Sequence, residues 1–368
     1  MTIKQVTAFL ENWVPLHLQE IYDNAGLITG DASWLCTGII CSLDATENVV
    51  NEAIEKKCNL VIAHHPILFR PIKKITNSSY VERTIIKAIK NDIAIYAIHT
   101  NLDNITGGVN SAMAQKLGLD EKSLSILSPK KELLAKLYTY VPLPQVEAVK
   151  TALFNAGAGA IGLYNECSFS VTGTGTFKPM EGTEPYIGSA GGKREEVPEA
   201  KIEFIFPAAR QRQILEVLLQ SHPYEEVAYE IIRLENADQY IGSGLIGALP
   251  ETISEAGFLN LVKKTFNLSV IKHTPLLNKP IKKIALCGGA GSFLIKNAIA
   301  AGADAYITAD VKYHEFFDAD GKTLLLDIGH WESEQYTIDL MANFLQDKIP
   351  TFAVLKTEIN TNPVHHFV

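Results

Sequence analysis

Short, continuous apolar runs alternate with amphipathic stretches at both ends of this chain, and this alternation constrains the fold more than any other feature. The runs lie at residues 37–44, 59–63, 93–98, 283–287, 305–308 and 323–328. Amphipathic stretches with apolar residues at helical spacing lie between them, at residues 47–57, 292–302 and 334–347. The runs are continuous rather than alternating, as strands covered by helices on both faces are. The pattern predicts a layered α/β fold.

The middle of the chain has a different order. Between residues 129 and 236, strand and helix patterns follow as β-α-β and again β-α-β, and the strands there alternate apolar with polar residues. This order predicts a ferredoxin-like α+β unit. A chain of 368 residues also exceeds what one hydrophobic core usually serves. We therefore expect a discontinuous α/β domain, residues 1–128 and 237–368, split by an inserted domain at 129–236.

Charge, hydropathy and cysteine content exclude several classes of protein. The formal net charge is -8, and no Lys/Arg run exceeds a pair such as Lys130-Lys131, which disfavours binding driven by nucleic-acid phosphates. The sequence lacks a signal-peptide pattern and any run of about 18 apolar residues, so we expect no membrane segment. Its five cysteines are scattered without a C-x-x-C pair, which indicates a reducing cytoplasm and neither disulfides nor a thiolate zinc site.

Ligand-type side chains gather where predicted strands end. The carboxyl ends of strands in an open α/β sheet form its ligand crevice. Four runs end in such residues: Asp44; His64 and His65; His99 and Asp103; His330, Glu332 and Glu334. A single histidine after a strand is more often structural than functional. The convergence of four such segments favours a binding site.

Two of these segments have informative spacing. His64 and His65 are adjacent where the chain leaves a strand, so both imidazoles can turn into one cavity, and Pro66 stiffens the exit. The pair alone fits a structural role equally well. If residues 329–334 open a helix, His330 and Glu334 lie at i and i+4 on one face and can reach the same metal or adjacent metals. Glu332 then points elsewhere, with an acid's ordinary role in a first helical turn.

Three imidazoles and two carboxylates come from three distant segments. The set is His64, His65, Asp103, His330 and Glu334. It is too large for one catalytic zinc, which typically has three protein ligands, and it suits a dinuclear centre with a bridging carboxylate. A nitrogen and oxygen set without thiolate suits Zn, Fe, Mn, Ni or Co and does not choose among them.

Seven motifs along the chain resemble those of a known family. They are I-Y-D-N-A-G-L-I-T-G (21–30), S-L-D-A-T (42–46), I-A-H-H-P (62–66), H-T-N-L-D (99–103), C-G-G-A-G-S (287–292), Y-I-T-A-D-V-K-Y-H (306–314) and G-H-W-E-S-E (329–334). In this order they resemble the GTP cyclohydrolase 1 type 2 homologue family, also called the Nif-three-like proteins. Two departures are mild: the family's W-D-N reads Y-D-N at residues 22–24, and its T-G-D reads T-A-D at residues 308–310.

The resemblance implies an α/β protein that binds two divalent metal ions per chain. By motif, the implied metal ligands are His64, His65, Asp103, His330 and Glu334. It further implies a toroidal homohexamer with the metal sites facing an internal cavity. Longer bacterial members carry a middle domain similar to the PII and CutA proteins, which agrees with the insertion at 129–236.

Some motif residues have open roles. His314 belongs to the family motif and is a candidate to face a substrate or support a ligand, and His99 is expected to orient a ligand or pack behind Asp103. Gly288, Gly289 and Gly291 resemble a phosphate-binding turn, but Leu294 stands where a third glycine of the dinucleotide fingerprint would fall. A tight strand-to-helix turn at the cavity wall is the favoured interpretation.

Two functions from different classes fit these residues. Two bridged cations lower the pKa of a shared water, so metal-dependent hydrolysis is the leading hypothesis, and no side chain is assigned as catalytic. The family name suggests a nucleotide-like substrate such as GTP. The alternative is a non-enzymatic metal-binding regulatory or scaffold assembly, in which the middle domain docks a partner or senses an effector.

Overall fold

The computed structural model describes residues 1–367, which form a mixed α/β fold in two compact units. Unit 1 combines the two ends of the chain, Met1–Pro129 and the segment from Gln239 onward. Unit 2 is the continuous segment Lys130–Asp238.

Unit 1 contains two sheets, where the alternation alone indicates only one layered α/β domain. The first has the strand order β1-β4-β3-β2-β15. Its strands are β1 (Gly26–Thr29), β2 (Ile39–Asp44), β3 (Leu60–His65), β4 (Ala94–Ala97) and β15 (Val354–Lys356). All neighbouring pairs are parallel except β1 with β4. The predicted runs 37–44, 59–63 and 93–98 correspond to β2, β3 and β4.

The second sheet of unit 1 has the order β11-β14-β13-β12-β10-β5. Its strands are β5 (Ser125–Pro129), β10 (Gly242–Ile253), β11 (Lys272–His273), β12 (Ile281–Ala290), β13 (Ala305–Ala309) and β14 (Leu324–Asp327). The central β12, β13 and β14 are parallel and correspond to the three predicted runs of the C-terminal half. The other neighbouring pairs are antiparallel. Their strands β5, β10 and β11 do not coincide with any of the predicted apolar runs.

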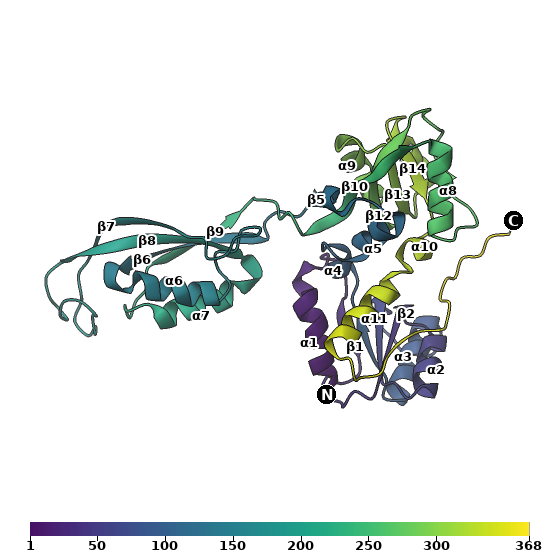
Figure 1. Ribbon diagram of the computed structural model, residues 1–368. Coiled ribbons are helices and arrows are strands. Elements are labelled where there is room, and N and C mark those ends of the chain that lie inside the picture. Colours follow the sequence, from purple (N-terminus) through teal and green to yellow (C-terminus); the bar gives the residue numbers. More distant parts are fainter. Residues whose placement is uncertain (368) are drawn as a thin grey trace. The chain divides into compact units, whose positions relative to one another are not determined.

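Helices cover both faces of the first sheet, as its continuous apolar strands require. These helices are α1 (Ile3–Trp13), α2 (Glu47–Glu55), α3 (Tyr80–Lys90) and α11 (Thr337–Lys348). Val49 of α2 and Ile85 of α3 share a buried cluster with Val61 of β3. On the other face α11 contacts β2, and Trp13 of α1 stacks on Phe344 of α11. Figure 1 shows the two helix pairs on opposite sides of the sheet.

The second sheet is covered in the same way by shorter helices. They are α5 (Val109–Leu117), α8 (Glu255–Thr265) and α9 (Ile295–Ala300), with the 3-10 segments η5 (Ser292–Leu294) and η6 (Tyr313–Ala319). Met113 of α5 and Phe258 of α8 share a buried cluster with Ile307 of β13, whereas Ile295 of α9 packs with Tyr306. Two short helices, α4 (Thr100–Asp103) and α10 (His330–Glu334), follow β4 and β14. The predicted start of the helix 334–347 is thus wrong, because the helix is interrupted between Glu334, where α10 ends, and Thr337, where α11 begins.

Unit 2 has the order β-α-β-β-α-β. Its elements are β6 (Leu134–Pro142), α6 (Val146–Asn155), β7 (Phe169–Phe177), β8 (Glu195–Pro207), α7 (Gln211–Ser221) and β9 (Tyr229–Leu234). The sheet is antiparallel with the order β7-β8-β6-β9. Alternate residues of β6, such as Leu137 and Val141, are buried with Leu153 of α6 and Leu218 of α7. Both helices therefore cover one face of this sheet (Figure 1).

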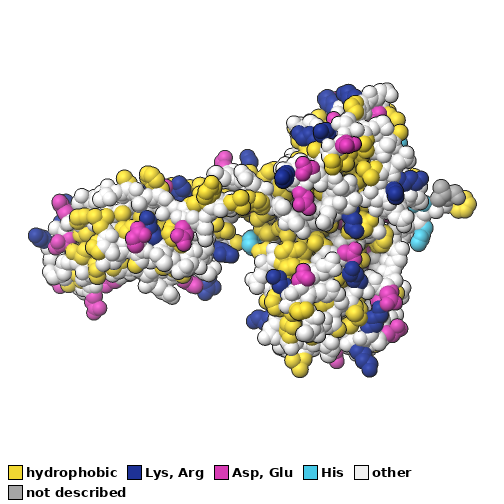
Figure 2. All heavy atoms as spheres, viewed as in Figure 1, with side chains coloured by type: hydrophobic (Ala, Val, Ile, Leu, Met, Phe, Trp, Pro, Cys, Tyr) yellow, Lys and Arg dark blue, Asp and Glu magenta, His cyan; other side chains and the backbone are white. Residues whose placement is uncertain are grey.

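Two expectations about the whole chain can be compared with the structure. Among residues 1–367, no helix is long and apolar enough to cross a membrane. All five cysteines are free thiols in the structure. On the face seen in Figure 2, acidic and basic side chains are interspersed.

Candidate metal centre

Three segments of unit 1 bring ligand-type side chains to one place. His64 and His65 end strand β3 of the first sheet, and Asp103 ends helix α4, which follows β4. His330 and Glu334 are the first and last residues of α10, which follows β14 of the second sheet. The structure thus brings together all five residues that the sequence indicates as ligands.

His64 presents a bare nitrogen to two carboxylates. Its Nδ1 lies 2.8 Å from the carbonyl oxygen of Ile98, which can only accept, so the proton is on Nδ1 and Nε2 carries a lone pair. That Nε2 lies 3.5 Å from Asp103 Oδ1 and 3.8 Å from Glu334 Oε1. Neither His64 Nε2 nor Asp103 Oδ1 has a hydrogen-bond partner among the described residues, although both are buried. Two buried acceptors that face each other are satisfied by a shared proton or by a metal cation between them.

A second group forms around the other oxygen of Glu334. Glu334 Oε2 lies 2.9 Å from His65 Nε2 and 3.1 Å from His330 Nε2. The two imidazole Nε2 atoms are 3.3 Å apart. The i and i+4 positions of His330 and Glu334 therefore face the same point, as their spacing predicts.

The two groups share one carboxylate. His64, Asp103 and Glu334 form one potential metal-binding set, and His65, His330 and Glu334 form another. Each set offers three ligand atoms, and Glu334 turns one oxygen toward each. Glu334 is therefore placed to be a ligand in both of these sets. A third set consists of His64, His65 and His99. His99 is not among the five ligands predicted from the sequence.

Three histidines of the centre, His65, His330 and His99, each have a carboxylate within hydrogen-bond distance of the ring nitrogen Nδ1. Asp44 Oδ1 lies 2.8 Å from His65 Nδ1, and Asp310 Oδ2 lies 2.7 Å from His330 Nδ1. Asp23 Oδ1 lies 2.7 Å from His99 Nδ1. Carboxylates in this position fix the ring orientation of metal-ligating histidines and raise their basicity.

These supporting roles of the carboxylates were not predicted from the sequence, although a signal existed for one of them. Parallel pairing of β2 and β3 places Asp44 beside His65, so correct strand registration would have joined the two. Asp23 and Asp310 reach their histidines from separate loops, and no local pattern predicts that contact.

The charges of the centre are strongly coupled. Burial acts to lower the pKa of His65, but hydrogen bonds with Asp44 and Glu334 outweigh it and raise the pKa to about 9. Burial is likewise outweighed at His330, where the charge of Glu334 and the hydrogen bond with Asp310 raise the pKa to about 11. Burial lowers the pKa of His64, and burial together with Glu334 raises that of Asp103 well above its usual range. Without a metal, protons therefore occupy the Nε2 positions of His65 and His330.

Gly288 and Gly289, at the end of β12, make room for Glu334. Gly289 has φ +62°, and a Cβ there would lie 2.3 Å from Glu334 Oε1. The loop's amides are already used: Gly288 N–H donates to Asn110, Gly289 N–H to Ser333, and Gly291 N–H to Thr308. The phosphate-binding interpretation is therefore wrong, because no N–H of these three glycines is left to point at an anion.

The remaining candidates lie around the centre. His314 is exposed in η6, against the rings of Tyr313 and Phe317, and belongs to none of the metal-binding sets. Glu332 belongs to none of the metal-binding sets and accepts a hydrogen bond from Asn362. A pocket of about 380 Å³ opens beside the centre, and His65 and His330 line it together with Lys272.

Comparison with known proteins places this arrangement in a family. The family model described as Duf34/NIF3 (NGG1p interacting factor 3) matches residues 1–363. The chain belongs to the Duf34/NIF3 family. A NIF3-family relative from Halalkalibacterium halodurans, named GTP cyclohydrolase 1 type 2 homolog, is 40% identical over 97% of both chains. A relative of the same name from Bacillus subtilis is 36% identical over 98% of this chain and 97% of its own.

A solved structure agrees with this membership. The crystal structure of a Bacillus cereus protein related to NIF3 is 35% identical, covers 100% of this chain and 99% of its own, and superimposes with a TM-score of 0.84. The family resemblance seen in the seven sequence motifs is confirmed.

Proposed function

We propose that this NIF3-family chain binds two divalent metal ions, one in each ligand set that shares Glu334. The observation that carries the proposal is the pair of buried, unpartnered acceptors, His64 Nε2 and Asp103 Oδ1, 3.5 Å apart. His64, Asp103 and Glu334 would hold one ion, and His65, His330 and Glu334 the other. Zn, Fe, Mn, Ni and Co all suit these nitrogen and oxygen ligands.

We further propose that the centre serves metal-dependent hydrolysis of a nucleotide-like substrate. When bound, two adjacent divalent ions activate water and polarise a carbonyl, phosphoryl or ring carbon. The chain's own residues hold the ligands in place: Asp44 and Asp310 orient His65 and His330. The name of the two relatives, GTP cyclohydrolase 1 type 2 homolog, supports a purine nucleotide as the substrate. The adjoining pocket of about 380 Å³ has the size of a small-ligand site.

Metal content and turnover test this function together. Wild-type protein loaded with Zn or Mn is expected to hold about two ions per chain and to hydrolyse GTP or a phosphoester. His64→Ala removes the one imidazole of the first set, so the metal content should fall to about one ion per chain and turnover should be lost. Elemental analysis and product chromatography measure the two. Wild-type protein that stays metal-free would contradict the metal proposal, whereas loaded protein inert toward a broad panel would contradict hydrolysis alone.

Metal affinity should rise with pH. Because the pKa of His65 is raised to about 9, a proton occupies its Nε2 at neutral pH and must leave when a metal binds. His330, whose pKa is raised to about 11, must give up its Nε2 proton as well, so two displaced protons give about 100-fold tighter binding per pH unit below pH 9, and less above it. Competition with a chromophoric chelator at pH 6.5, 7.5 and 8.5 measures this slope. Asp44→Asn removes one group that raises the pKa and should flatten the slope, and a flat wild-type profile would contradict the prediction.

Two features support a proposal for the assembly. The β-α-β-β-α-β order and the strand order of unit 2 are those of a ferredoxin-like domain, and we propose that it is an inserted domain of the PII and CutA type. The family resemblance supports a toroidal homohexamer. A non-enzymatic regulatory or scaffold assembly is the second candidate, and it is favoured by a large pocket in unit 2, whose lining contains no residue of the metal centre.

A further inference from the structure

Unit 2 contains a pocket of about 570 Å³ on the sheet face that its helices leave open. The pocket is lined by Glu199 and Lys201 of β8. These residues alternate with Ala200 and Ile202, which are buried against the helices, so the pocket lies on the face opposite α6 and α7. Loops 178–186 and 224–228 complete the wall. This volume is within the range of small-molecule sites.

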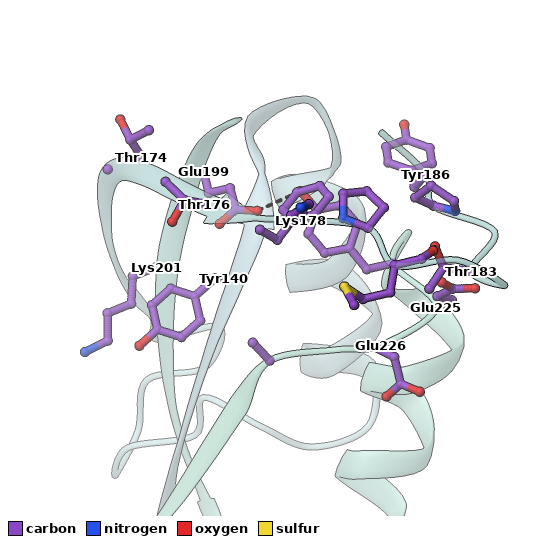
Figure 3. Close-up of a pocket in the computed structure, with 18 of the residues that line it drawn as sticks. Tyr140, Thr174, Thr176, Lys178, Thr183, Tyr186, Glu199, Lys201, Glu225 and Glu226 are labelled. Atoms are coloured by element: carbon purple, nitrogen blue, oxygen red, sulfur yellow. Dashed lines mark hydrogen bonds between the residues drawn. The ribbon is translucent and has the colours of Figure 1, made fainter. Parts of the chain in front are cut away.

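Aromatic rings form much of this wall. Phe177 and Tyr224 are in edge contact with ring centroids 5.5 Å apart, and Tyr186 lies 6.2 Å from Tyr224. Tyr140 of β6 adds a fourth ring. Figure 3 shows Tyr140 and Tyr186 on different parts of the wall, with Glu199 set between the strands and the loop. Such rings attract a flat apolar body, and their faces attract a cation.

The carboxylate of Glu199 is a buried polar group of the pocket with one oxygen left over. Glu199 is only 7% exposed. Its Oε1 accepts a hydrogen bond of 2.7 Å from the hydroxyl of Tyr224, drawn dashed in Figure 3. Its Oε2 accepts no hydrogen bond from residues 1–367. A Cβ added to Gly175 would lie 1.9 Å from this Oε2. The glycine leaves room for this oxygen at the pocket wall.

No cation in the described part of the chain neutralises this carboxylate, since Glu199 makes no ion pair there with Lys or Arg. Lys201 directs its Nζ to the ring of Tyr138, 4.2 Å away, and to Glu203, and it points away from Glu199 in Figure 3. Glu225 and Glu226 add further acids to the lining, whose basic residues are Lys178 and Lys201. A buried carboxylate costs free energy unless a donor or cation meets it.

We propose that this pocket binds a small organic cation, with an ammonium or amidinium group at Glu199 and a flat apolar body against the tyrosines. The cation supplies the missing donor to Glu199 Oε2, and such charge-assisted hydrogen bonds are stronger than neutral ones. The proposal is independent of the metal centre, because the pocket is built from unit 2 alone.

Benzamidinium and its neutral analogue benzamide test this proposal, because they share shape and differ in charge. With full-length protein in a calorimetric or NMR titration, benzamidinium should bind about tenfold more tightly than benzamide. Glu199→Gln keeps the side-chain size and an acceptor for Tyr224 but removes the charge, so the preference should disappear. The control Glu147→Gln removes a charge at an exposed position outside the pocket and should retain the preference.

Two further variants keep the test decisive. Tyr186→Ala should weaken both ligands while leaving the preference for the cation. If Glu199→Gln does not fold, Gly175→Ala replaces it, because its Cβ displaces the carboxylate without removing it. Equal affinity for the two ligands, a preference that survives Glu199→Gln, or no binding up to about 10 mM would each overturn the proposal. In the last case, a change of oligomeric state in Tyr186→Ala would assign the pocket to contact with a second copy of the chain.

Discussion

Glu334→Gln is expected to empty both metal sites, reducing the metal content from about two ions per chain to near zero after dialysis. Glu334 is 3% exposed. It is the one residue shared by the set that contains His64 and Asp103 and the set that contains His65 and His330. Glutamine has nearly the same size, so packing is kept, but the negative charge is lost and a weak amide oxygen replaces the two carboxylate oxygens. The remaining ligands of each set are then two, with less charge to offset the ion's desolvation.

The control for this variant is at Glu332, two residues before Glu334 in the same short helix α10. Glu332→Gln makes the same chemical change, but Glu332 contacts Asn362 and belongs to neither set. Elemental analysis and competition with a chelator should show full metal content in Glu332→Gln and a loss of affinity of at least about 100-fold in Glu334→Gln. If Glu334→Gln retained two ions, the shared carboxylate would not be a ligand and the dinuclear proposal would fail.

Gly289→Ala is expected to weaken metal binding by about 10- to 100-fold without touching a ligand. The new Cβ would lie 2.3 Å from Glu334 Oε1 and 3.3 Å from His330 Cε1. Because no real Cβ contact is so short, the carboxylate must leave its position between the two sets. Alanine at φ +62° adds a backbone cost of about 1 kcal/mol, which lowers stability but not metal affinity.

Gly302→Ala separates the two effects. Gly302 has φ +71°, and a Cβ there would meet nothing within 4 Å, so alanine carries the backbone cost alone. In thermal unfolding of the metal-free protein, Gly302→Ala should lose the backbone cost alone and Gly289→Ala should lose more, because it also displaces Glu334 from His65 and His330. Only Gly289→Ala should lose metal affinity in a chelator titration. Equal metal affinity in the two variants would show that the turn does not position Glu334.

Much of the fold follows from local pattern. The strands buried on both faces need continuous apolar runs, and β2, β3, β4, β12, β13 and β14 each lie within or around such a run. The edge strands β1, β5, β11 and β15 and the antiparallel β10 were not predicted. An edge strand is paired on one side only and packs on fewer neighbours, so its composition carries a weaker signal.

The candidate site was predictable in its residues but not in its arrangement. The adjacent His64 and His65 and the helical spacing of His330 and Glu334 are local patterns with a direct chemical meaning. The prediction named Asp44 and His99 at strand ends, but it did not pair any carboxylate with a histidine and did not count His99 as a ligand beside His64 and His65. These contacts join segments that are far apart in sequence, for example Asp23 and His99.

By itself, the sequence determined the alternating elements, the family and the ligand-type residues, because each depends on residues near one another in the chain. Only the tertiary structure decided that two sheets supply the centre, that Glu334 turns one oxygen to each set, and that the glycine turn accommodates this carboxylate. It also decided that Glu199 lies in an aromatic pocket of unit 2. The physical reason is that distances between atoms of distant segments depend on how whole layers pack, and no local periodicity records that packing.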